Sequence, residues 1–80
     1  MTINQAFGQT LKRLREDADL SQEALALNCD LDRTFISLLE RGLRQPSLAT
    51  IFTLAKELKT LPSSMVAEVE KSMTRPHKKK

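Results

Sequence analysis

The side chains best suited to recognition chemistry lie together in one stretch, LDRTFISLLERG at residues 31–42. Wound into a helix, this stretch has an apolar face, and a second face gathers Thr34, Ser37, Leu38 and Arg41 at helical spacing. The hydroxyls can donate and accept hydrogen bonds, and the guanidinium can only donate. The second face is therefore either ordinary solvated surface or a surface that recognises a ligand.

Residues capable of catalysis are not arranged for it. The single histidine, His77, lies near the C-terminus, and Cys29 has neither a second cysteine nor a nearby histidine in the sequence. No carboxylate pair or phosphate-binding loop stands out. We therefore predict that the protein is not an enzyme and has no metal site, cofactor or small-molecule ligand. Cys29 is expected to be a small buried apolar residue.

The charge of the chain is unevenly distributed. The 80 residues suffice for one domain with a modest core, and their formal net charge is +3. Residues 75–80 contribute four positive charges, whereas residues 1–74 carry nine Lys and Arg against ten Asp and Glu. A nucleic acid would therefore have to bind a local basic patch or the tail. We expect residues 75–80 to be a basic disordered tail. It would be a nonspecific DNA contact, a contact with an anionic surface or a solubilising end, and we favour the first or the last.

Targeting signals are not apparent in the sequence. No apolar run approaches the roughly 18 residues of a membrane-spanning helix. The N-terminal MTINQAFGQT lacks the basic and apolar parts of a secretory signal. A single cysteine fits a reducing compartment. We expect a cytoplasmic protein with no membrane partner.

Caps and apolar stripes predict five short helices in residues 1–74. The N-caps are expected at Thr2, Ser21, Asp32 and Ser47, and the fifth helix from about residue 64 to 73. Left-handed backbone is expected at Asp30 and Gly42. The buried stripes are expected to be Ile3, Phe7, Leu11, Leu14 and Ala18 in the first helix; Ile36, Leu39 and Leu43 in the third; and Leu48, Ile51, Phe52, Ala55 and Leu58 in the fourth. The prediction is a compact all-α domain whose second and third helices form a helix-turn-helix.

Residues 14–58, LREDADLSQEALALNCDLDRTFISLLERGLRQPSLATIFTLAKEL, resemble the Cro/C1-type helix-turn-helix domains, also called the XRE family. In both, SQE opens the second helix, Ala26 marks the helix crossing, ISLLERG closes the third helix and PSL opens the fourth. The LDRTFIS segment is similar to the restriction–modification controller branch. Two positions depart from the family pattern. Asp30 replaces the usual glycine, and Phe35 replaces a frequent tyrosine, whose hydroxyl is lost.

The resemblance implies a lambda repressor-like DNA-binding domain whose recognition helix, residues 33–41, enters the major groove. The groove distinguishes bases by donors, acceptors and the thymine methyl, which suits the base-reading candidates Arg33, Thr34, Ser37 and Leu38. The phosphate-binding candidates are Gln22, Phe35, Arg41, Arg44, Gln45 and Ser47. For Phe35, packing in the core is an equal alternative. The family also implies a structural ion pair between Arg15 and Glu40.

The expected function is that of a homodimeric transcriptional regulator on a pseudo-palindromic operator in double-stranded DNA. Its two recognition helices would lie one DNA turn apart, about 34 Å. The apolar stripe of the fifth helix either covers the core or forms the dimer contact, which we favour: Met65, Val66, Val69 and Met73. The alternative function is an antitoxin-like interaction module in which DNA binding is secondary.

Overall fold

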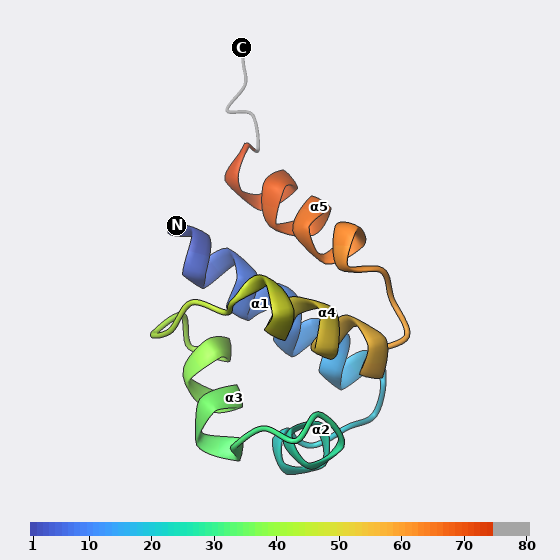
Figure 1. The fold of residues 1–80 in the computed structure, drawn as a ribbon. Helices are drawn as coiled ribbons and strands as arrows, with labels where there is room; N and C mark the ends of the chain where they lie inside the picture. The colour runs from blue at the N-terminus through green and yellow to red at the C-terminus, as the bar shows by residue number, and fades with distance from the viewer. Residues whose placement is uncertain (75–80) are drawn as a thin grey trace.

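The computed structural model describes residues 1–74, which form five helices (Figure 1). Their bounds are α1 Ile3–Asp17, α2 Gln22–Asn28, α3 Arg33–Glu40, α4 Leu48–Glu57 and α5 Pro62–Met73. Over these residues the structure is all-helical, which confirms the predicted fold class. None of these helices has both the length and the apolar character needed to cross a membrane. The tail predicted for residues 75–80 lies outside the described residues.

The helix ends form where the sequence predicts them, with one exception. Thr2 and Gln5 exchange side-chain to backbone hydrogen bonds of 3.1 and 2.8 Å at the start of α1. The other three predicted N-caps, Ser21, Asp32 and Ser47, each accept a backbone N–H of the helix they precede. The exception is α5, which begins at Pro62, earlier than predicted, because proline fits the first turn of a helix.

The turns after the helices use left-handed backbone. Asp30 has a φ of 57° and Gly42 a φ of 74°, as the sequence predicts. Asp19 and Lys59, which we did not predict, also have positive φ values. Residues 29–32, which connect α2 to α3, thus reverse the chain with an aspartate where glycine is the easier choice.

The core lies between α1 and the helices that pack around it. The contacts of α1 are mainly with α5 and α3, while α2 packs on α3 and α4 packs on α5. Figure 1 shows α4 crossing in front of α1, with α5 on one side and the α2–α3 pair on the other. The largest fully buried side chains are Leu11, Leu25, Ile36, Leu39, Leu54 and Met65. Met65 therefore belongs to the core, because the face of α5 that carries it packs against α1.

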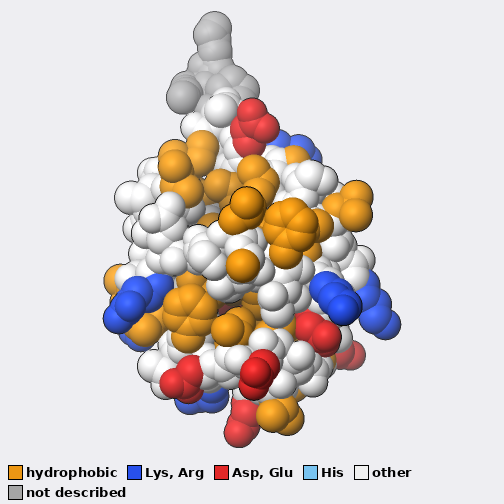
Figure 2. All heavy atoms as spheres, viewed as in Figure 1, with side chains coloured by type: hydrophobic (Ala, Val, Ile, Leu, Met, Phe, Trp, Pro, Cys, Tyr) orange, Lys and Arg blue, Asp and Glu red, His pale blue; other side chains and the backbone are white. Residues whose placement is uncertain are grey.

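Several residues that we predicted to be buried are exposed instead. They are Ile3 and Ala18 in α1, Leu43 after α3, and Leu48 and Phe52 in α4. The stripe predicted for α4 is wider than the surface that its neighbours cover. Of its five residues, Ala55 and Leu58 belong to the core and Ile51 packs against it. In Figure 2, apolar side chains gather on the face that displays α4 and α5.

Cys29 is buried, as the sequence predicts. Burial raises the pKa of its thiol, and the negative charge of Glu57 raises that pKa further. Both effects disfavour the thiolate, which is the reactive form of cysteine. Cys29 therefore acts as a small apolar member of the core at neutral pH.

Gly8 allows α1 and α3 to approach closely. A Cβ atom placed on Gly8 would lie 2.6 Å from the backbone oxygen of Glu40 and still closer to that of Leu39. Backbone atoms of a packed helix cannot move aside as the end of a flexible side chain can. The contact therefore requires glycine, and it fixes the end of α3 against α1.

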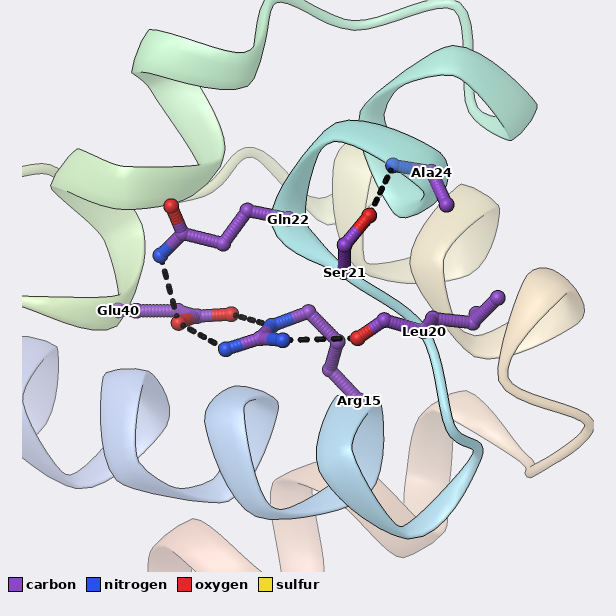
Figure 3. A network of polar contacts seen from close by, with 6 residues as sticks. All are labelled: Arg15, Leu20, Ser21, Gln22, Ala24 and Glu40. Carbon is purple, nitrogen blue, oxygen red and sulfur yellow. Dashed lines mark hydrogen bonds and ion pairs between the residues drawn. The ribbon is translucent and has the colours of Figure 1, made fainter.

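A buried ion pair ties the same two helices together (Figure 3). The Nε and Nη2 atoms of Arg15 donate to the two carboxylate oxygens of Glu40, at 2.6 and 3.1 Å. The Nη1 atom of Arg15 donates to the backbone oxygen of Leu20 at 2.8 Å, in the turn that leads to α2. The expected pair is thus present, and its hydrogen bond raises the pKa of Arg15 although burial acts in the opposite direction.

We expect Gly8→Ala to lower the free energy of unfolding by about 1–3 kcal/mol, because the new methyl group overpacks the α1–α3 contact. This figure is a net loss, after the gain of about 1 kcal/mol that alanine normally brings to a helix interior. Urea denaturation measures the difference. Gln9→Ala, at an exposed position of the same helix, is the control and should change stability little. A Gly8→Ala protein as stable as the native one would contradict the close approach.

Arg15→Ala should cost about 3–5 kcal/mol of unfolding free energy, since it leaves the Glu40 carboxylate buried and unpaired. Replacing both partners with methionine should cost less than that single change. The matched control is Arg13→Ala, whose exposed pair with Glu68 spans 3.5 Å and should be worth less than about 1 kcal/mol. Equal losses for Arg15→Ala and Arg13→Ala in denaturation would refute a structural role for the buried pair.

Candidate nucleic-acid interface

The two faces of α3 differ as the sequence predicts. Ile36 and Leu39 are fully buried against the rest of the domain. The four residues predicted to read bases lie at the surface: Arg33 and Thr34 are exposed, and Ser37 and Leu38 are half-buried. Asp32 caps the helix by accepting the N–H of Thr34, which fixes the start of α3. The structure thus brings these four side chains together on the outer side of one helix.

This outer face carries the chemistry that base edges require. A guanidinium fork can donate two parallel hydrogen bonds to guanine, and hydroxyls can donate or accept with several bases. The half-buried Leu38 offers an apolar surface that can pack on a thymine methyl group. Contacts of these residues with DNA stay predictions.

Gln22, predicted to bind a phosphate, lies at the start of α2 with its side chain turned toward α3. Its Nε2 atom donates to the Oε1 atom of Glu40 at 2.9 Å (Figure 3). Glu40 therefore accepts hydrogen bonds from both Arg15 and Gln22. We call these three residues, with the backbone oxygen of Leu20, the Glu40 network. The family resemblance implied the ion pair, whereas no spacing in the sequence indicates the bond between Gln22 and Glu40.

The remaining phosphate candidates lie at the end of α3 and in the connection to α4. Arg41, Arg44, Gln45 and Ser47 are all exposed. The Ser47 hydroxyl accepts the N–H of Thr50 at 3.0 Å, so it caps α4 in addition to any contact with phosphate. Arg33, Arg41 and Arg44 thus place three arginines in or just after α3, although residues 1–74 as a whole have almost no net charge.

Phe35 is half-buried and packs against the core. The structure therefore supports the packing role that the sequence left open for this side chain. Its aromatic ring has no donor or acceptor for a phosphate oxygen, and contact with sugar or methyl groups stays a prediction.

A second surface is apolar and lies on α4 and α5. Of the four residues predicted to form the dimer contact, Val66 and Met73 are exposed, whereas Val69 is half-buried against the core. Met65 was assigned to this contact wrongly, because it is fully buried within its own protomer. Three residues that we had placed in the core are also exposed and apolar: Ile3, which lines a hollow together with Val66, and Leu48 and Phe52 on α4. We call these four residues, Ile3, Leu48, Phe52 and Val66, the α4–α5 face.

The α4–α5 face borders a shallow hollow. This hollow lies between the start of α1, the connection before α4, and the two last helices. Its lining is mostly apolar and consists of Ile3, Asn4, Phe7, Gln45, Pro46, Ile51, Val66 and Val69. Exposed apolar side chains around a hollow are typical of a protein contact surface.

Comparison with known proteins assigns the family. The helix-turn-helix family matches residues 11–64 of the chain. Control protein C.BamHI of Bacillus amyloliquefaciens is 42% identical over 65 residues, which cover 80% of this chain and 80% of the relative. The crystal structure of the restriction–modification controller protein C.AhdI from Aeromonas hydrophila is 42% identical, with a TM-score of 0.75 over 78% of this chain and 94% of that one.

A further solved structure contains DNA. It is the controller protein C.Esp1396I, as a tetramer in complex with its natural 35 base-pair operator. It is 25% identical to this chain, with a TM-score of 0.79, and the match covers 91% of this chain and 96% of that one. The family match, residues 11–64, includes the whole helix-turn-helix described above. The chain therefore belongs to the Cro/C1-type helix-turn-helix family, also called the XRE family.

Proposed function

We propose that this protein is a sequence-specific transcriptional regulator of the restriction–modification controller type. It binds a pseudo-palindromic operator as a homodimer and places α3 of each protomer in the major groove. The observation that carries the proposal is the outer face of α3, with Arg33, Thr34, Ser37 and Leu38 at the surface of a helix that the core holds rigidly. The relatives described as control proteins support the same function.

Phosphate contacts flank this recognition face in the proposal. Gln22 contacts the last residue of α3, and Arg41, Arg44 and Gln45 are exposed residues that follow that helix. Such contacts fix the register of the protein on DNA and supply affinity that falls with salt, while base contacts supply the choice of sequence. This division suits a domain whose described residues carry little net charge, because attraction to DNA must come from a few well-placed groups.

The α4–α5 face forms the dimer contact in the proposal. Phe52 is 57% exposed, although a buried aromatic ring brings a large gain in free energy. A two-fold contact brings the same surface of two protomers together, so an apolar face can cover itself. This assignment replaces the contact through Met65 and keeps Val66 as the contribution of α5.

Selection of bound duplexes from a random DNA pool tests the proposed function. We expect an enriched sequence with two inverted half-sites, for the native protein and for a variant that ends at Thr74. Arg33→Ala should lose the preference at one position in each half-site, because a good arginine–guanine pair contributes about 1–3 kcal/mol of discrimination. Arg13→Ala, on the α1 surface that contacts α5, is the control and should keep the preference. Binding without any enriched sequence would contradict base reading by α3.

Phe52→Asp should convert the protein to a monomer, because the contact would have to bury an unpaired carboxylate. Sedimentation velocity measures the change, and circular dichroism checks that the helices remain. Leu27→Asp is the matched control, since Leu27 is equally apolar and 79% exposed but lies on α2. It should leave the dimer intact. A Phe52→Asp protein that sediments as a dimer would exclude the α4–α5 face.

A further inference from the structure

Glu40, the last residue of α3, links this helix to side chains of α1 and α2. One of its carboxylate oxygens, Oε1, accepts hydrogen bonds from Nη2 of Arg15 at 3.1 Å and from Nε2 of Gln22 at 2.9 Å. The other oxygen accepts from Nε of Arg15 at 2.6 Å. The side chain of Glu40 is only 3% exposed. A single buried carboxylate thus holds side chains from α1 and α2 at the end of α3.

This arrangement determines how Gln22 presents its amide. A glutamine amide has an oxygen that accepts and a nitrogen that donates two hydrogen bonds. Because a carboxylate only accepts, it can hold the amide only by the nitrogen. In Figure 3 the amide nitrogen of Gln22 faces Glu40, and the amide oxygen points away from it, toward α3. One N–H of Nε2 is used in this bond, and the nitrogen has a second N–H to donate.

We propose that Glu40 is a positioning residue for phosphate binding: it holds one N–H of Gln22 so that the other is directed at a DNA phosphate. The inference rests on the proposed function, in which Gln22 lies beside the DNA backbone. Arg15 makes the arrangement compatible with an anion, since its guanidinium neutralises the carboxylate. A side chain that is already fixed also loses less entropy on binding than a free one.

The competing arrangement is one in which Glu40 withholds Gln22 from DNA. Gln22 would then have to leave the carboxylate before it could bind a phosphate. The burial of Glu40 argues against this, because releasing Gln22 would give up a charge-assisted hydrogen bond at a site with little access to water. The two arrangements predict opposite signs for the energetic coupling between Gln22 and Glu40.

A double-mutant cycle on DNA affinity measures this coupling. The first background is the native chain, and the second carries Arg15→Met and Glu40→Met, which remove the acceptor without leaving a buried charge unpaired. Gln22→Ala is made in both. The probe is a duplex of mixed sequence at low salt, because phosphate contacts do not depend on sequence. Circular dichroism confirms that each protein is folded at the temperature of the binding measurement.

We expect Gln22→Ala to weaken binding by at least about tenfold in the native background, the effect of a hydrogen bond to a charged group. In the second background the loss should fall to less than about threefold, since an untethered amide is a poorer phosphate donor. Gln45→Ala is the matched control, a second glutamine proposed to bind phosphate but placed outside the Glu40 network. Gln45→Ala should weaken binding equally in both backgrounds. If the methionine pair disturbed the structure in general, the effect of Gln45→Ala would change as well.

An equal loss for Gln22→Ala in both backgrounds would overturn the positioning role, and so would a larger loss in the second one. If the native protein bound no duplex at all, the proposed function would fail, and this inference with it.

Should the methionine pair not fold, a second experiment on the native chain tests the same inference. Nuclear magnetic resonance should show one side-chain amide proton of Gln22, the one that Glu40 holds, protected from solvent exchange both before and after the duplex is added. Loss of that protection on binding would show release from Glu40 and overturn the inference.

Discussion

Gly8 lets the backbone of α1 lie against the last carbonyl groups of α3, and this contact sets the position of α3 on the domain. Two turns further along α1, Arg15 reaches the same end of α3 through its ion pair with Glu40. The steric contact and the electrostatic one fix both the distance and the orientation of the two helices. An eight-residue helix such as α3 is marginal by itself, so its direction depends on this support.

The domain separates its tasks between two surfaces. One side presents α3 with hydrogen-bonding groups and three nearby arginines, and α4 and α5 present apolar side chains. In the proposed function, affinity for DNA and affinity for a second copy come from different residues and respond to different conditions. Salt weakens the charged contacts, whereas apolar burial is much less sensitive to it. In such a design the operator affinity depends on protein concentration, because one protomer offers only half of the reading surface.

Local features of the sequence were enough to predict where four of the five helices begin, since Thr2, Ser21, Asp32 and Ser47 cap them through interactions within a few residues. Burial was harder to predict. Phe52 and Leu48 fit a helical stripe, but whether such a stripe is covered depends on the path of distant helices. Met65 was misplaced for the same reason. The bond between Gln22 and Glu40 depends on how α2 crosses α3. The requirement for glycine at position 8 likewise becomes evident only once α3 is placed beside α1.

The central claim is that the outer face of α3 contacts DNA and the α4–α5 face does not. The most direct test is to follow backbone amide signals by nuclear magnetic resonance while the selected operator duplex is added to the preformed dimer. The account predicts the largest shifts at Arg33, Thr34 and Ser37 and at the start of α2, with little change around Phe52 and Val66. Shifts that gather on α4 and α5 while the α3 signals stay in place would contradict it.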